Sequence, residues 1–344
     1  MSKMDKIKDI SLVITTINKP NDVIKRYLTL CKNSKINYII IGDKKTPSYS
    51  KKYPLINTLK QKKLSFKIID SLPYNSYSRK NIGYLLAIEN KSKIIIETDD
   101  DNYPKNSFFK NLEIKKRLIE LSGPEWINVI KFFDKKNMSI WQRGFPLTLI
   151  NEESKIKKKS KIIYSPIQQR MIDGNPDVDA IFRLTNKFKY YKFRNQNYAI
   201  NPKSLCPFNT QNTVWHKIAF PLMYLPSYCT MRSTDIWRSF IASRVLKNYN
   251  WSLTFLKSTV IQNRNIHDLM DDFKQEYPVY KNTVVFNKIL KDTKLSNKYD
   301  DMLINIYKCY DALTKNKILE KKELNLLSKW LVDINKIYPD FKKI

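Results

Sequence analysis

The first hundred residues alternate between short apolar runs rich in β-branched residues and segments with helical periodicity. The apolar runs are residues 10–17, 36–41, 66–69 and 93–98, and the helical segments between them are residues 22–31, 53–63 and 76–89. This alternation is the pattern of βαβ units, which place successive strands parallel in one sheet with helices on its faces. We therefore expect an α/β fold with a mostly parallel central sheet. The chain has only five glycines and no Gly-x-Gly-x-x-Gly loop, which excludes a dinucleotide-binding fold.

Three consecutive carboxylates follow the last of these apolar runs. Asp99, Asp100 and Asp101 come directly after the strand-like segment IIIET. Adjacent carboxylates repel one another, and a hard divalent cation can neutralise them. In open α/β sheets, ligands bind beyond the carboxyl ends of the strands. A strand that ends in Asp-x-Asp is typical of the metal–diphosphate site of nucleotide-sugar glycosyltransferases, although an isolated acidic run is also compatible with a solvated turn.

Polar side chains also follow the other predicted strands. They are Thr15 and Thr16 after the first strand, Asp43 after the second and Asp70 after the third. Because the carboxyl ends of parallel strands share one edge of a sheet, we expect these side chains to line one cleft together with the three acids. Hydroxyls and a carboxylate can bind base and ribose, while a cation bridges the acids and the diphosphate. Each residue alone is better explained as a turn residue. The prediction therefore rests on the fact that all of them occur at the carboxyl ends of predicted strands.

The helix predicted after the third strand begins with Ser78, Arg79, Lys80 and Asn81. Its free N–H groups and its two cations suit a phosphate or sugar ligand, and solvated surface is the alternative for both cations. Gly83 inside this helix costs roughly 1 kcal/mol relative to Ala, which indicates a close approach to a neighbouring element.

Beyond residue 100 the pattern is less regular. We expect a strand over residues 126–133, a surface loop over residues 151–161, a helix over residues 235–246 and helices from about residue 280 to the end. A boundary near residue 270 divides a nucleotide-sugar-binding domain, residues 1–270, from a C-terminal helical region, residues 271–344.

The formal net charge is +31, and most of the excess is lysine spread along the whole chain. A nucleic-acid groove would show clustered arginines with interleaved aromatic residues, so we expect no specific nucleic-acid partner. Association with a membrane or another anionic surface stays open. The four cysteines form no Cys-x-x-Cys pair, which suits a reducing compartment. No apolar leader and no apolar stretch of about 20 residues is evident, so we expect a soluble, cytoplasmic protein.

Six motifs occur in a fixed order along the chain. They are residues 41–47 (IGDKKTP), 72–88 (LPYNSYSRKNIGYLLAI), 173–184 (DGNPDVDAIFRL), 208–213 (FNTQNT), 235–238 (DIWR) and 264–267 (RNIH). In this order they resemble the STELLO family of glycosyltransferase-like proteins, from about residue 10 to the C-terminal helices. The resemblance implies a GT-A-like fold, with a more distant likeness to plant reversibly glycosylated polypeptides. Plant members carry a Golgi membrane anchor, and that localisation is not carried over to this sequence.

The resemblance also implies roles for individual residues. By likeness to GT-A enzymes, Asp99 and Asp101 would hold Mn²⁺ or Mg²⁺ and, through it, the diphosphate of the donor. Asp100 would contact the ribose or be structural. His267 would be a late metal ligand, with a helix-capping surface histidine as the alternative. Asp235 would be the general base near the start of a helix, where an aspartate is equally favoured as an N-cap.

We therefore predict a metal-dependent glycosyltransferase that moves a sugar from a nucleotide-diphospho-sugar, expected to be a UDP-sugar, to a glycan or another hydroxyl acceptor. A non-catalytic GT-A-like scaffold or regulator of polysaccharide synthesis is the alternative, and a sugar mutase ranks below both. Residues 173–180 are expected on the acceptor or donor-sugar side of the cleft. Trp141, Trp215 and Trp237 could stack on sugars, but lone tryptophans more often lie in a core.

Overall fold

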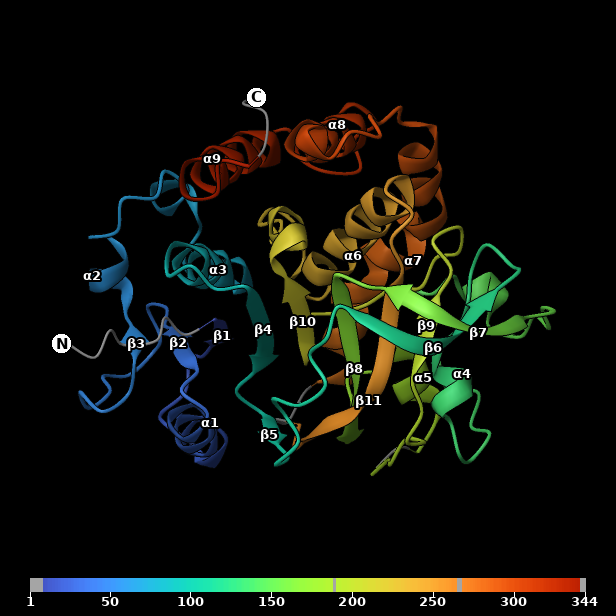
Figure 1. Cartoon of the computed structure of the whole chain (residues 1–344), viewed down its shortest axis with the longest axis horizontal. Coiled ribbons are helices and arrows are strands. Elements are labelled where there is room, and N and C mark those ends of the chain that lie inside the picture. The colour runs from blue at the N-terminus through green and yellow to red at the C-terminus, as the bar shows by residue number, and fades with distance from the viewer. Residues whose placement is uncertain (1–8, 188–189, 265–267, 341–344) are drawn as a thin grey trace.

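The computed structural model describes residues 9–187, 190–264 and 268–340. Its strands are β1 Ile10–Thr15, β2 Asn37–Ile41, β3 Leu55–Ile56, β4 Ile94–Asp99, β5 Asn102–Pro104, β6 Lys115–Ser122, β7 Lys157–Tyr164, β8 Ile167–Gly174, β9 Tyr198–Ile200, β10 Thr213–His216 and β11 Leu253–Gln262. In these described residues the strands form one sheet in the order β3-β2-β1-β4-β10-β8-β11-β9-β6-β7, with β5 paired to β11 (Figure 1).

Helices cover both faces of this sheet. The α-helices are α1 Asp22–Asn33, α2 Thr58–Gln61, α3 Lys80–Glu89, α4 Ile130–Phe133, α5 Ala180–Thr185, α6 Met231–Asn248, α7 Leu269–Asp292, α8 Met302–Lys315 and α9 Lys322–Ile337. Figure 1 shows α3 and α6 between the sheet and the outer pair α8 and α9, with α1 on the opposite side. The predicted α/β class, a central sheet flanked by helices, is confirmed, and its arrangement is consistent with a GT-A-like fold.

The strand directions divide the sheet into two parts. Strands β3, β2, β1 and β4 are parallel to one another, as the βαβ pattern predicts. Strand β10 runs antiparallel to both β4 and β8, and the rest of the sheet mixes the two directions. The sheet is therefore parallel where the sequence alternation was regular and partly antiparallel beyond it.

The parallel strands are apolar because both of their faces are covered. On β1, Val13 joins the hydrophobic cluster on the α3 side, whereas Leu12 and Ile14 join the cluster on the α1 side. On β4, Ile95 and Ile96 are divided in the same way. Side chains alternate between the two faces of a strand, so a strand buried on both faces needs an unbroken apolar run.

Gly83 allows α3 to lie close against the sheet. A Cβ atom at this position would be 2.5 Å from Cγ1 of Val13 on β1 and 3.0 Å from Cγ1 of Ile41 on β2. The first separation is shorter than real Cβ contacts, so any residue other than glycine would require Val13 or α3 to shift. The close approach predicted from the sequence is confirmed.

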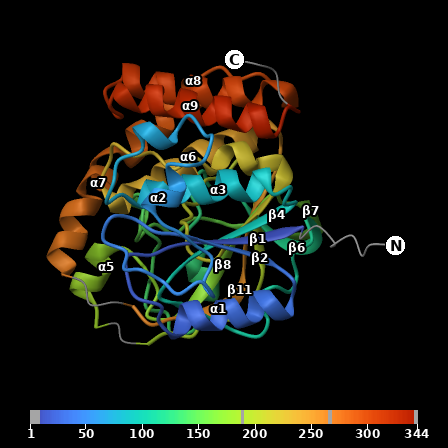
Figure 2. The same ribbon diagram turned by 90° about the vertical axis from the view of Figure 1, so that its left-hand side faces the viewer.

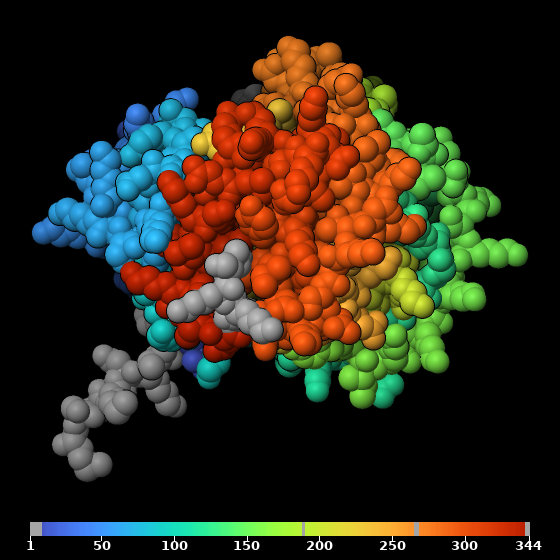
Figure 3. Space-filling view, turned by 90° about the horizontal axis from the view of Figure 1, so that it is seen from above, coloured from blue at the N-terminus to red at the C-terminus, as the bar shows by residue number. Residues whose placement is uncertain are grey.

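The C-terminal helices share their core with the sheet. Leu303 of α8 and Trp330 of α9 belong to the same hydrophobic cluster as Val13 of β1, and Figure 3 shows these helices covering much of one face of the molecule. The division at residue 270 stays a prediction. Among the described residues, no helix combines the length and the apolar character needed to cross a membrane.

The predicted third strand, residues 66–69, is wrong. This segment leads into a single 3-10 turn at Ile69–Ser71. The backbone N–H groups of Lys67 and Ile68 donate to the carboxylate of Asp333 on α9, at 2.8 and 2.9 Å, and not to a neighbouring strand. A side chain 265 residues away in the sequence thus satisfies the groups that would have formed the ladder.

Other local predictions were also wrong or shifted. Residues 126–133 contribute one isolated bridge and the short helix α4, not a strand. Residues 157–161, expected within a loop, form the start of β7 paired with β6. The predicted helix over residues 53–63 is the short strand β3 followed by α2. Helix α7 begins at Leu269, before the expected residue 280.

A buried ion pair joins β4 to α6. The guanidinium of Arg238 donates to both carboxylate oxygens of Glu97, at 3.0 and 2.7 Å. Trp215 Nε1 donates to the same carboxylate at 2.8 Å, and Tyr84 also donates to it. Both charged side chains are almost completely inaccessible to solvent. Because water cannot reach either group, each charge is stabilised mainly by the other and by the hydrogen bonds around the pair.

We predict that Arg238→Met destabilises the protein by about 3–5 kcal/mol, because Glu97 would be left charged and unpaired in the core. Urea denaturation measures this loss. Arg117→Met, at an exposed position on β6, is the matched control and should change stability by less than about 0.5 kcal/mol. If Arg238→Met lowered the free energy of unfolding by less than about 1 kcal/mol, the conclusion that Glu97 needs Arg238 as its counterion in the core would be wrong.

Candidate functional site

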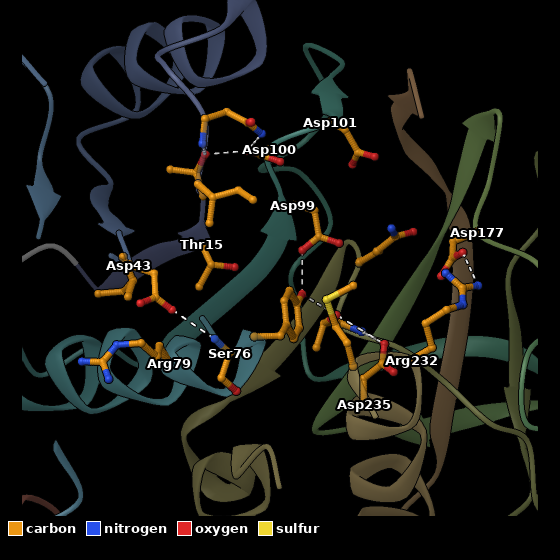
Figure 4. A pocket seen from close by; sticks show the side chains of 18 of the residues that line it. Thr15, Asp43, Ser76, Arg79, Asp99, Asp100, Asp101, Asp177, Arg232 and Asp235 are labelled. Atoms are coloured by element: carbon orange, nitrogen blue, oxygen red, sulfur yellow. Dashed lines mark hydrogen bonds and ion pairs between the residues drawn. The ribbon is translucent and has the colours of Figure 1, made fainter. Parts of the chain in front are cut away.

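One cavity of about 480 Å³ lies at the carboxyl ends of the parallel strands, between them and the start of α6. It is lined by eight of the residues predicted from the sequence: Thr15, Thr16, Asp43, Arg79, Asp99, Asp100, Asp101 and Asp235. Figure 4 shows Asp43, Thr15 and the three adjacent aspartates on one side of the cavity and Asp177, Arg232 and Asp235 on the other. The residues at the ends of β1, β2 and β4 thus lie together at one edge of the sheet, as their positions after the strands predicted.

The three adjacent aspartates have different surroundings. Asp100 accepts hydrogen bonds from Thr16 Oγ1 at 2.5 Å and Asn18 Nδ2 at 2.9 Å, which hold it against the end of β1. One oxygen of Asp101 accepts from Gln262 Nε2 at 2.8 Å, while its buried Oδ1 has no hydrogen-bond partner within the described residues. Burial, reinforced by Asp99, raises the pKa of Asp101 to about 7.

Asp99 connects the two sides of the cavity through a short chain of hydrogen bonds. Its Oδ1 accepts from the Tyr77 hydroxyl at 2.6 Å and from the Lys80 ammonium at 3.0 Å. The Tyr77 oxygen lies 2.6 Å from Thr210 Oγ1. The backbone N–H of Thr210 then donates to Asp235 Oδ2 at 3.3 Å. The acidic strand end and the predicted base are therefore held in one connected network.

Asp235 is not an N-cap. Helix α6 begins four residues earlier, at Met231, and Thr230 occupies the cap position. The Asp235 carboxylate accepts from Arg143 at 3.0 Å through Oδ2, and its buried Oδ1 has no hydrogen-bond partner within the described residues. Burial raises the pKa of Asp235, although Arg143 opposes the shift. The carboxylate is thus fixed through Oδ2, while Oδ1 is buried and unpaired within the described residues.

Three arginines meet at a single buried carboxylate on the far wall of the cavity. Asp177 lies 3.1 Å from Arg143, 2.8 Å from Arg232 and 2.7 Å from Arg264. Burial alone would raise the pKa of Asp177, but the three arginines hold it well below its ordinary value. Asp177 is therefore ionised and anchors this wall.

Helix α7 supplies the second layer behind this wall. Asp272 accepts from Arg264 at 2.6 Å, and Glu276 accepts from Nε of Arg232 at 2.6 Å. Both acids are buried on the inner side of α7. The guanidinium groups that line the cavity are thus held from two sides, which leaves them little freedom to reorient.

The remaining predicted site residues do not line the cavity. Asp70 is exposed on the 3-10 turn that replaced the expected strand. Asn81 is buried in α3 and exchanges two hydrogen bonds with the backbone of Leu225, a structural contact. Lys80 is buried beneath the cavity and contacts its lining through Asp99 and the Tyr77 hydroxyl. His267 lies outside the described residues.

Several lining residues were not singled out from the sequence. Tyr77, Thr210 and Arg264 lie within the motifs at residues 72–88, 208–213 and 264–267, so those motifs could have indicated them. Arg143 and Arg232 carried no local signal, because nothing in a sequence marks an arginine as buried against a distant acid. Trp141, Trp215 and Trp237 are buried in the core and not placed to stack on a ligand.

Comparison with known proteins agrees with the motifs. The profile of the STELLO glycosyltransferases matches residues 232–344. Two proteins of Arabidopsis thaliana, Probable glycosyltransferase STELLO1 and Probable glycosyltransferase STELLO2, are each 26% identical to this chain over 256 residues, covering 68% of it. The chain is therefore similar to STELLO glycosyltransferases, as the motifs indicated. It spans about a third of the length of these two STELLO proteins, 33% of each.

The matched STELLO region contains Asp235, Arg238 and Arg264, which contribute to the cavity or to its buried support. Among solved structures, a crystal structure of a mycobacterial protein aligns with a TM-score of 0.45 and 8% sequence identity, over 81% of this chain and 74% of that one.

We predict that Asp101→Asn is more stable than the wild type in the absence of metal. A carboxyl whose pKa is raised on folding destabilises the folded state as the pH rises from about 4 through 7, because the unfolded chain releases the proton more easily. Removing this ionisation should stabilise the protein by about 4 kcal/mol at pH 8, since a pKa raised from about 4 to about 7 corresponds to about 1.4 kcal/mol for each pH unit, and the gain should vanish toward pH 4.

Urea denaturation in EDTA at both pH values measures the difference. Asp300→Asn, at an exposed position, controls for the general effect of removing one negative charge. Equal stability of Asp101→Asn and the wild type at pH 8 would show that the Asp101 carboxylate is not strained in the folded protein.

Proposed function

We propose that this chain is a glycosyltransferase domain that transfers a sugar from a nucleotide-diphospho-sugar, with a UDP-sugar as the expected donor, to a hydroxyl of a glycan acceptor. The observation that carries the proposal is the convergence of the strand-end acids and Asp235 on one cavity. The names of the plant STELLO relatives are in line with it. A purely structural domain has no physical need for a buried, unpaired carboxylate oxygen beside two further acids.

The donor would lie across the ends of β1, β2 and β4. Thr15, Thr16 and Asp43 offer hydroxyls and a carboxylate to the nucleoside. Asp43 is itself held by the backbone N–H groups of Lys44 and Ser76, at 2.7 and 3.1 Å, so its position is set before a ligand arrives. A preorganised donor site of this kind lowers the entropy lost on binding.

Asp99 and Asp101 fit a divalent cation shared with the donor. The described residues contain no cluster of three His, Cys, Asp or Glu side chains that could hold a metal ion unaided. Mg²⁺ is, however, commonly bound by one or two carboxylates together with substrate phosphates. A neighbouring cation would give the unpaired Oδ1 of Asp101 a partner, and it would lower the raised pKa of this carboxyl. When bound, Mn²⁺ or Mg²⁺ would neutralise charge on the diphosphate leaving group.

Asp235 would accept the proton of the acceptor hydroxyl. Its Oδ1 is unpaired, and the raised pKa of the carboxyl increases its basicity. Arg143 orients the carboxylate through the other oxygen. The polar wall formed by Asp177 and its arginines would then face the acceptor, because it lies on the side of the cavity opposite the strand-end acids.

We expect one class of nucleotide-sugar to raise the melting temperature in Mn²⁺ but not in EDTA. A ligand at about 100 times its dissociation constant stabilises a protein by about 2.7 kcal/mol, enough for a measurable shift. The measurement is a thermal denaturation panel of UDP-, GDP-, ADP- and CDP-sugars. Absence of a shift with every donor, in folded protein, would favour the scaffold hypothesis.

Asp101→Asn should lose the Mn²⁺-dependent part of this shift, and Asp300→Asn should retain it. An unchanged Mn²⁺-dependent shift in Asp101→Asn would remove Asp101 from the metal site while leaving the donor site intact. The two variants carry the same change in charge, so the difference between them reports on the position of the carboxylate.

We predict that Asp235→Asn reduces transfer by a factor of about 10²–10⁴, because the amide cannot accept the hydroxyl proton. The donor-induced thermal shift should persist, since Asp235 lies across the cavity from the donor residues. Release of nucleoside diphosphate from the identified donor, in the presence of mono- and oligosaccharide acceptors, measures the rate.

Asp272→Asn is the matched control. Asp272 belongs to the same buried network but lies in its second layer, away from the cavity. Its loss should lower stability while leaving transfer far above that of Asp235→Asn. Equal rates in the two variants would mean that Asp235 acts only as a structural member of the network.

A further inference from the structure

Helix α7 exposes four large apolar side chains on its outer face. Met270, Tyr277, Val284 and Val285 are 52, 55, 59 and 48% exposed. The first three are spaced by seven residues, close to two helical turns, so they lie along one line of the helix. Single exposed apolar residues are ordinary on a protein surface, but an aligned set on one helix marks an interaction surface.

A row of lysines accompanies this apolar line. Lys274, Lys281 and Lys288 are exposed and also spaced by seven residues, so they run beside it along the whole helix. The exposed acids of α7, Asp271 and Asp292, lie at its two ends. Asp271 pairs with Lys274 at 3.3 Å, but both groups are solvated and the pair is weak. The outer face of α7 is therefore both apolar and cationic.

The N-terminal half of α7 is joined to the start of α6, which lines the cavity. Figure 2 shows α7 along the outer side of the molecule. Thr230, just before α6, donates to the backbone carbonyl of Gln275 on α7 at 2.5 Å. The next residue, Met231, lines the cavity and is 55% exposed.

We propose that the outer face of α7 docks on an anionic lipid surface. Interfacial helices combine an apolar line, which enters the headgroup region, with lysines that attract anionic lipids. A second copy of the chain would bring lysine rows against each other, and a nucleic acid would leave the apolar line unburied. The proposal is independent of the transfer reaction, since it concerns a surface outside the cavity.

Sedimentation of the full chain with vesicles tests the proposal. We expect binding to vesicles of phosphatidylcholine mixed with phosphatidylglycerol, and little binding to phosphatidylcholine alone. Each lysine near an anionic surface contributes about fivefold to binding. Replacing Lys274, Lys281 and Lys288 together by Gln should therefore weaken binding about a hundredfold. Replacing Lys157, Lys158 and Lys159 by Gln on β7 removes the same charge from another exposed element and should have a much smaller effect.

The apolar line is tested by Tyr277→Ser combined with Val284→Ser, which leaves the net charge unchanged. This variant should also lose binding, by roughly tenfold or more, because apolar area no longer enters the interface. Both positions are exposed, so folding should be retained, and a thermal melt checks it. Equal losses for the two lysine triples would overturn the proposal in favour of general charge attraction. It would also be overturned by failure to sediment with anionic vesicles, by dimerisation through α7, or by duplex DNA binding in place of lipid.

Discussion

The paired charges of Glu97 and Arg238 fix the two halves of the cavity relative to each other. Glu97 precedes Asp99 by two residues on β4, and Arg238 follows Asp235 by three residues on α6. The bidentate contact between them therefore sets the separation between the acidic strand end and the predicted base. A buried ion pair adds little net stability compared with apolar packing, but its geometry is specific and its loss is costly. Here that specificity determines the shape of the site.

A second buried network determines the opposite wall. Asp177 holds Arg143, Arg232 and Arg264, and α7 supports two of these arginines from behind. This wall of the cavity is thus formed by ionised groups whose partners are already in place. Preorganised charges of this kind can stabilise developing charge without further rearrangement. The same helix presents an apolar and cationic outer face, so α7 is shared between the wall of the cavity and the surface of the molecule.

Much of the candidate site could be predicted from residues near the ends of strands. Thr15, Asp43 and Asp99 follow apolar runs, and parallel strands place such residues at a common edge whatever their distant partners are. Asp70 failed this rule because its segment is not a strand: Asp333 on α9 takes up the backbone N–H groups that a ladder would need. The interpretation of Asp235 as a cap failed because α6 extends one turn further toward its N-terminus than the apolar pattern indicated.

The sequence by itself determined the parallel part of the sheet (β3-β2-β1-β4), the acids at the end of β4 and the close packing of α3 at Gly83. Each of these follows from local spacing, since strand alternation and helical periodicity are properties of neighbouring residues. Only the tertiary structure decided which charges are paired. Arg143 meets Asp235 across 92 positions of the sequence, and Arg238 meets Glu97 across 141. A buried charge needs a counterion close by in space, and that counterion can come from any part of the chain. Local sequence spacing therefore does not identify such partners.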